Sequence, residues 1–252
     1  MSEALYDFGG LRFWTEREIL ARERICAQIT DTIKRSLREV NQAWAFERVD
    51  TPLIIPRSRL NPAYTGDDAF FLRDPMGETE MVLRAETTDG SYTIARHLLK
   101  TTNMKPPLGV WQLGQSFRRE LSDGASASNL RFNGFYQLEF QLVYASDTHF
   151  DYGVMLRARL AALVARITGL ETRIVPSDRL PPYSEETMDI EVFWRAPTKV
   201  AASADYTGEW KEVCSMSRRT DFPQDHGFKK DLKVFEVAFG ADRMVVVSQG
   251  AL

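Results

Sequence analysis

Residues 117–141 read FRRELSDGASASNLRFNGFYQLEFQ, and this stretch carries most of the information about the fold. An apolar segment over 109–120 becomes charged at its end. A polar loop covers 122–129, and a return segment then carries Arg131, Phe135, Gln137 and Glu139. This order predicts two strands joined by a loop, with charged side chains where the strands meet the loop.

The hairpin carries side chains that suit a nucleotide. Arginine side chains such as Arg118 and Arg131 pair with phosphate through a planar fork. Glu120 can accept a hydrogen bond from an adenine amino group, and the Phe135 ring can cover an adenine face. Alternating charges are equally typical of a solvated hairpin, so this segment alone leaves both interpretations open.

The composition excludes several classes of protein. The formal net charge of −3 argues against a protein that coats nucleic acid non-specifically, because such proteins are basic. No apolar run approaches the roughly 18 residues needed to cross a membrane. The first ten residues hold two acids and no basic residue, which resembles neither a secretory signal nor a transit peptide. We therefore expect a cytoplasmic protein. Its two cysteines and three histidines are scattered, which disfavours a zinc site.

Hydrophobic spacing and turn residues predict the elements. A long helix is expected over 15–43, with Thr15 as N-cap and Glu18 completing a capping box. A short strand over 46–50 ends at Thr51 and Pro52. The remaining predictions are a hairpin over 70–73 and 80–84, helices over 91–100 and 149–168, strands over 171–175, 188–195, 208–217 and 233–239, and a final helix near Gly240.

Strands dominate the centre of the chain without alternating with helices as βαβ units do. This order predicts an α+β domain, with an antiparallel β-sheet flanked by helices. The loop-rich stretch 176–185 is interpreted as an excursion within one domain covering 1–252, since neither side of it forms a complete unit.

Several segments resemble, in family order, the catalytic core of the class II aminoacyl-tRNA synthetases. The resemblance is greatest to the glycyl enzymes and weaker to the prolyl and threonyl enzymes. Residues 83–90 resemble "LRPETAQG", 117–139 the second class motif "FRNE…RxxEFxQxE", and 235–243 the third motif "IEPSFGIDR". Residues 5–11 are similar to "LYDYGPLG", 15–52 to the first motif, and 210–222 to "GWxExxGIAxRTDFDL".

The resemblance implies ATP-dependent activation of an amino acid, with an aminoacyl-adenylate and pyrophosphate as products. By this resemblance Arg118, Arg131 and Arg243 would be the catalytic residues, all of them binding phosphate oxygens. Glu120 would read the adenine amino group and Phe135 would stack on the base. ATP and Mg²⁺ would be the cofactors.

Acidic residues have two implied roles. Glu212 would assist ATP binding and, with Glu236, would be a candidate ligand of Mg²⁺, which favours one or two carboxylates plus phosphate oxygens. The implied amino-acid pocket contains Glu86, Gln137, Glu139, Arg219, Glu236 and Ala238. Glycine is the first expectation for its ligand.

Some positions depart from the glycyl pattern. Ala238 replaces a serine, Gln141 an acid, Gly134 a glutamate and Ser215 a glycine. Buried polar groups dominate discrimination between substrates, so another small or polar amino acid stays open.

The resemblance also implies a homodimer formed through 15–52. The chain stops nine residues after Arg243, so we expect no anticodon-binding domain within it. The acceptor stem of a tRNA is the expected partner. Two alternatives stay open: an adenylate-forming enzyme that acylates a carrier protein or small molecule, and a non-catalytic accessory subunit.

Overall fold

A seven-stranded sheet is the central element of the computed structural model, and the other elements pack around it. The structure describes residues 7–8, 11–64, 67–72, 77, 80–102, 104–119, 125–178, 180–203, 205–221 and 231–248. The strand order is β3-β7-β8-β12-β11-β10-β9. The strands are β3 (Ala45–Arg48), β7 (Leu108–Phe117), β8 (Gly134–Ala145), β12 (Leu232–Gly240), β11 (Glu209–Arg219), β10 (Ser184–Trp194) and β9 (Thr172–Pro176).

The sheet is mostly antiparallel, as the sequence predicts, with one exception. β3 pairs with β7 in parallel, from Ala45 opposite Leu108 to Arg48 opposite Trp111. The other neighbouring strands of this sheet run antiparallel. The hairpin predicted around the 122–129 loop is the β7–β8 pair, in which Phe117 lies opposite Gly134.

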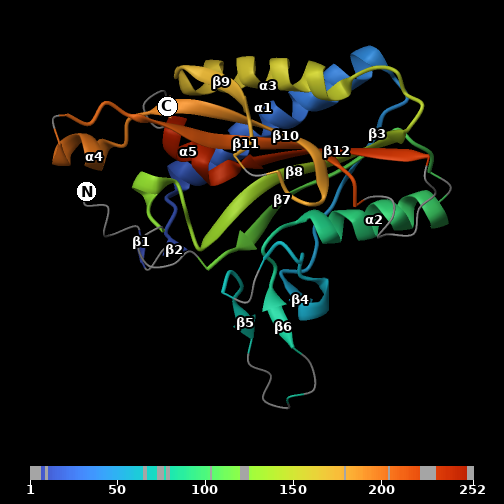
Figure 1. The fold of residues 1–252 in the computed structure, drawn as a ribbon, viewed down its shortest axis with the longest axis horizontal. Helices are drawn as coiled ribbons and strands as arrows, with labels where there is room; N and C mark the ends of the chain where they lie inside the picture. Colours follow the sequence, from blue (N-terminus) through green and yellow to red (C-terminus); the bar gives the residue numbers. More distant parts are fainter. Residues whose placement is uncertain are drawn as a thin grey trace.

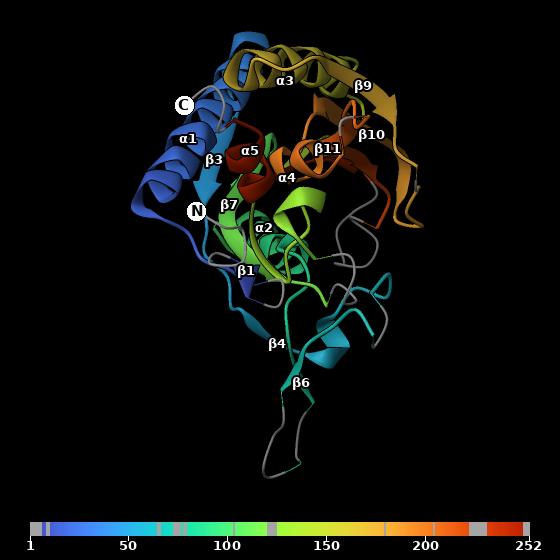
Figure 2. The same ribbon diagram turned by 90° about the vertical axis from the view of Figure 1, so that its left-hand side faces the viewer.

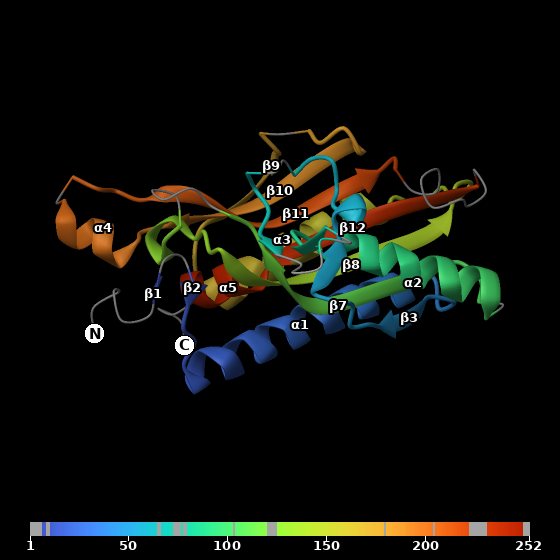
Figure 3. The same ribbon diagram turned by 90° about the horizontal axis from the view of Figure 1, so that it is seen from below.

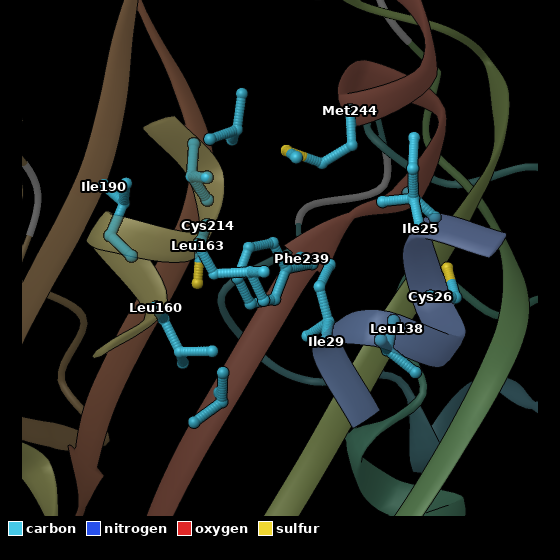
Figure 4. Packing of buried hydrophobic residues seen from close by; sticks show 14 of the residues in the cluster. Ile25, Cys26, Ile29, Leu138, Leu160, Leu163, Ile190, Cys214, Phe239 and Met244 are labelled. Atoms are coloured by element: carbon cyan, nitrogen blue, oxygen red, sulfur yellow. The ribbon is translucent and has the colours of Figure 1, made fainter. Parts of the chain in front are cut away.

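Helices cover the two faces of the sheet unequally. α1 (Glu16–Val40) and α3 (Tyr152–Thr168) lie side by side on one face, with α5 (Ala241–Ser248) beside them (Figures 1 and 2). The main hydrophobic core lies beneath these three helices (Figure 4). α2 (Thr88–Thr101) lies along β7 and β8 on the opposite face, as the view from below shows (Figure 3). Side chains of β8, β10, β11 and β12 line a cavity on this face.

Local sequence signals set where the helices begin and end. The predicted capping box is confirmed, because the Thr15 hydroxyl accepts from the backbone of Glu18 and the Glu18 side chain bonds back to Thr15. α1 ends at Val40, three residues earlier than predicted. Gly169 ends α3 in the left-handed conformation, with φ of 67°. α2 begins at Thr88 rather than at Ser91.

Smaller elements lie outside the large sheet. The predicted hairpin over 70–73 and 80–84 is present as β5 (Phe71–Leu72) and β6 (Met81–Leu83), and β4 (Ile54–Pro56), which was not predicted, joins them in a three-stranded sheet. This sheet projects away from the rest in Figure 1. The unpredicted α4 (Pro197–Ala202) lies between β10 and β11, and β1 (Asp7–Phe8) pairs with β2 (Leu11–Arg12). Within the described residues, no helix is long and apolar enough to span a bilayer.

Candidate active site

A cavity of about 310 Å³ lies on the face of the sheet opposite the main core. Its floor consists of side chains from β8, β12, β11 and β10, because alternate residues of a strand point to the same face. Its walls come from the start of α2, the segment before β8, the turn at Tyr64 and the loop that contains Tyr183. Four distant parts of the sequence therefore meet around one space.

Arg118 lies at one side of the cavity, stacked between two aromatic rings. Its guanidinium carbon is 5.0 Å from the Tyr64 ring centroid and 5.2 Å from that of Phe135. Its Nε donates to the carbonyl oxygen of Ala85 at 3.0 Å. These contacts hold the guanidinium group in a fixed plane, which suits it to pair with a carboxylate or phosphate.

Arg243 lies near the start of α5 and lines the same cavity as Phe135. Its Nε donates to the carbonyl oxygen of Leu130 at 2.9 Å, and its Nη1 lies 3.1 Å from Oε1 of Glu212. Both side chains are partly exposed, so this ion pair contributes little stability. Arg131 also lines the cavity and is exposed.

Three carboxylates gather in the deeper part of the cavity: those of Glu86, Glu139 and Glu236. One amide bridges two of them, because Nε2 of Gln141 donates to Oε1 of Glu139 at 2.8 Å and to Oε2 of Glu236 at 2.7 Å. Glu86 accepts from the side-chain amide of Asn61 at 2.9 Å. The cluster is thus organised by protein donors.

Burial makes this cluster hard to ionise fully. Burial, together with Glu236 and Glu86, raises the pKa of Glu139 to about 7, although hydrogen bonds from Gln141 and Thr87 oppose the shift. Burial also raises the pKa of Glu86, against the attraction of Arg219 and the hydrogen bond from Asn61. A cationic group entering the cavity would favour the charged forms of both.

Arg219 braces the cluster from the side. Its Nη1 lies 3.0 Å from Oε2 of Glu236, and its Nε and Nη2 bind Asp221 at 3.0 and 2.6 Å. The guanidinium carbon lies 3.8 Å from the ring centroid of Tyr183. The side chain is only 1% exposed, so Arg219 positions Glu236 and does not itself line the cavity.

Ten predicted site residues line this one cavity: Glu86, Arg118, Arg131, Phe135, Gln137, Glu139, Glu212, Glu236, Ala238 and Arg243. Arg219 lies directly behind Glu236. Glu120 lies outside the described residues. The structure therefore brings together residues that the sequence spreads over more than 150 positions.

Sequence reasoning missed Asn61, Tyr64, Thr87 and Tyr183 as parts of the site, and treated Gln141 only as a departure from the glycyl pattern on the side that selects the amino acid. The Thr87 hydroxyl donates to Glu139 at 2.8 Å, and Tyr64 and Tyr183 form aromatic walls. A signal was available for Gln141, because it continues the alternation of Gln137 and Glu139 on one face of a strand. The others lie in loops or at a helix start, where no periodicity marks them.

The two predicted metal ligands lie at different ends of the floor. Glu236 pairs with Ser217 across the β11–β12 ladder, five residues along β11 from Glu212. At about 3.4 Å per residue, that is roughly 17 Å along the strand, which disfavours one ion bound by both side chains. No group of three or more potential metal ligands occurs among the described residues. Mg²⁺ needs fewer when phosphates contribute.

A family model described as "tRNA synthetases class II core domain (F)" matches residues 23–251. The chain belongs to this family. A crystal structure of prolyl-tRNA synthetase from Cryptosporidium parvum, complexed with halofuginone and AMPPNP, shares the fold of this class II core, with a TM-score of 0.73 over 96% of this chain and 48% of that one. At 12% identity the likeness extends to the fold alone.

Curated relatives of this class II core include glycine–tRNA ligases. The enzyme from Alkaliphilus metalliredigens is 30% identical over 146 residues, which are 57% of this chain and 29% of that protein. The one from Acetivibrio thermocellus is 28% identical over 189 residues, 68% of this chain and 38% of that protein. The chain thus spans about a third of the length of these relatives.

Proposed function

We propose that this class II core activates a small amino acid with ATP and transfers the aminoacyl group to a tRNA. The observation that carries the proposal is the meeting, in one cavity, of Arg118 stacked on Phe135, a second arginine, Arg243, and a cluster of three carboxylates. The arginines and the ring suit a nucleotide, and the carboxylates suit an ammonium group. The glycine–tRNA ligases among the relatives support the same reaction.

The reaction has two steps. In the first, a carboxylate oxygen of the amino acid attacks the α-phosphorus of ATP, and the bond to the bridging oxygen breaks so that pyrophosphate leaves with the electron pair. In the second, an acceptor hydroxyl attacks the acyl carbon and loses its proton, and AMP leaves. The protein's task in the first step is to bring two anions together and to stabilise charge on the phosphate oxygens.

Arg118 suits that task because it stacks on Phe135 and lines the same cavity as the carboxylate cluster. Its fixed guanidinium plane would bind the amino-acid carboxylate and an α-phosphate oxygen at once. Arg243 and Phe135 would stack on the two faces of adenine, with Arg243 also near the outer phosphates. Arg131, exposed at the rim, would contact the phosphates from the loop side.

The carboxylate cluster would hold the ammonium group of the amino acid. Glu86, Glu139 and Glu236 supply acceptors, and the Gln141 amide joins two of them by donating to both. Ala238 lies between Glu139 and Ser215 in the ladder, so a methyl group stands where the glycyl pattern has a hydroxyl. We propose glycine as the first substrate to test, followed by alanine and serine.

Glu212 fits a Mg²⁺ ion better than Glu236 does. Its side chain is 44% exposed and lies beside Arg243, where the outer phosphates would lie, whereas Oε2 of Glu236 already accepts from Thr88, Gln141 and Arg219. With phosphate oxygens, Glu212 would hold the ion, which neutralises charge on the phosphates when bound. Glu236 would then serve the ammonium group alone.

Residues 1–252 would form one catalytic domain, because β12 lies between β8 and β11 and cannot belong to a separate unit. A homodimer through 15–52 is part of the proposal. The exposed apolar side chains of α1, Ile19, Leu20 and Val40, support such an interface.

ATP–pyrophosphate exchange across the standard amino acids tests the proposal. We expect exchange with one small amino acid, and that amino acid should then be attached to total tRNA. Exchange without tRNA charging would point to another acceptor. No exchange with any amino acid, by protein that is folded by circular dichroism, would contradict the proposal and favour an accessory role.

A further inference from the structure

The two proposed walls of the nucleotide slot come from distant parts of the chain. Phe135 lies at the start of β8, and Arg243 lies near the start of α5. Their neighbours are joined directly, because the backbone N–H of Tyr136 donates to Oδ2 of Asp242 at 2.8 Å. The hydrogen bond therefore joins the residue that follows Phe135 to the residue that precedes Arg243.

An arginine on α1 binds the other oxygen of the Asp242 carboxylate. Nη1 of Arg22 donates to Oδ1 of Asp242 at 2.9 Å, and the Arg22 guanidinium carbon lies 3.9 Å from the ring centroid of Tyr136. The two side chains of this ion pair are 9% and 1% exposed. One carboxylate therefore joins β8, α5 and α1 at a single buried point.

Stability alone does not account for this arrangement. Burying an ion pair carries a desolvation cost, and well-packed apolar residues of similar volume often serve as well or better. Burial raises the pKa of the Asp242 carboxyl even though Tyr136 and Arg22 oppose the shift. A charged group kept here at such a cost calls for a role beyond packing.

We propose that Asp242 is a positioning residue that sets the spacing between Phe135 and Arg243, and that Arg22 holds Asp242 in place. The inference rests on the proposed function, since the spacing matters only if a base stacks in the slot. Contact energy falls steeply with distance, and a gap of roughly 0.5–1 Å forfeits a quarter to a half of it. A small shift of either wall would therefore weaken nucleotide binding.

The base takes no part in bond making, so its contacts are equal in the ground state and the transition state. Their loss raises KM and leaves kcat unchanged. This signature separates a positioning role from a catalytic role and from a purely structural one.

Asp242→Asn is the first variant to test. One of the two terminal groups of the side chain then becomes a donor. The asparagine therefore cannot accept hydrogen bonds from both Tyr136 and Arg22 in their present positions. We expect KM for ATP in pyrophosphate exchange to rise about tenfold, because part of the stacking energy of the base is lost, with kcat kept. Equilibrium binding of ATP without amino acid should weaken by the same factor.

Arg22→Lys is the second variant and covers the case in which Asp242→Asn does not fold. It keeps the charge but loses the planar fork over Tyr136, so a smaller rise in KM for ATP is expected. Arg157→Met is the matched control, because it removes an ion pair between Arg157 on α3, which is only 8% exposed, and Glu186, and neither residue lines the cavity. It should lower thermal stability and leave KM for ATP unchanged.

The variants contradict the inference if thermal stability falls while KM for ATP and equilibrium binding match the wild type. A fall in kcat at unchanged KM contradicts it as well. Wild-type protein that does not bind ATP would overturn the proposed function first, and the positioning role with it. Wild-type binding that Asp242→Asn and Arg22→Lys leave intact would overturn only the positioning role.

Discussion

The two faces of β8 are equally buried but chemically opposite. Leu138, Phe140 and Leu142 point to the main core and are fully buried. Gln137, Glu139 and Gln141 alternate with them on the cavity face and are 6%, 2% and 0% exposed. The same strand thus buries three apolar and three polar side chains to nearly the same extent.

The core face stabilises the molecule, whereas the cavity face carries the chemistry that we propose. Burying apolar side chains is favourable, whereas burying a carboxylate costs free energy unless partners compensate. On the cavity face the compensation is incomplete, because the pKa of Glu139 stays near 7. Substitutions on the core face should therefore reduce stability, and substitutions on the cavity face should reduce activity.

The largest expected effect is on the core face. Phe140 stacks on Trp111 with ring centroids 5.4 Å apart, and Phe140→Ala would leave a cavity between the sheet and α1. We expect the free energy of unfolding in urea to fall by about 3–5 kcal/mol. KM for ATP of the folded fraction should stay at the wild-type value. A loss of stability below about 1 kcal/mol would show that the core face does not carry the stability expected of it.

Arg118→Ala tests the cavity side of the comparison. Removing a donor to developing charge should slow adenylate formation about 100- to 1,000-fold, or roughly 3–4 kcal/mol. The urea midpoint should change little, since Arg118 is only half-buried and binds one backbone oxygen. Arg119→Ala, at the exposed neighbouring position, is the matched control. Near-normal pyrophosphate exchange by Arg118→Ala would refute its role.

A smaller effect, with a characteristic pH dependence, is expected for Glu139→Gln. The folded pKa of Glu139 lies near 7, above its ordinary value of 4.5. Between these two values the folded protein keeps a proton that the unfolded chain has released, so the wild type loses stability as pH rises. Gln does not titrate, so the variant should become relatively more stable with rising pH.

Urea unfolding at several pH values measures this difference. The free energy of unfolding of Glu139→Gln, relative to that of the wild type, should increase by at most about 1.4 kcal/mol per pH unit between pH 4.5 and 7. Above pH 7 the difference should level off. Glu186→Gln is a control of opposite sign, because hydrogen bonds from Arg157 lower the pKa of Glu186. A stability difference between Glu139→Gln and the wild type that does not vary with pH would show that burying the charged Glu139 carboxylate costs no free energy.

Strands and helices were predictable where one residue type repeats at a fixed interval. The alternation along β8 and the capping box of α1 are local signals, and both elements appear where the sequence places them. The direction of β3 was not predictable. Its partner β7 lies about 60 residues later, and the path of the chain between them, rather than any pattern in residues 45–48, sets the parallel pairing.

The residues that line the cavity also differ in whether the sequence predicts them. Arg118, Phe135 and Arg243 belong to motifs that can be recognised from the sequence alone. Tyr64 and Tyr183 are single residues in loops, and only the folded chain brings their rings beside Arg118 and Arg219. A loop residue contributes through its final position, which local sequence does not encode.

The central place of β12 has a consequence for synthesis on the ribosome. β12 lies between β8 and β11 in the sheet but follows both in the chain, and Gln141 reaches Glu236 across 95 residues. A nascent chain that has emerged as far as residue 230 holds both neighbours and lacks the strand that joins them. Its cavity floor is open, and its sheet edges are unpaired and prone to aggregation. The growing chain is therefore most vulnerable just before its last strand emerges.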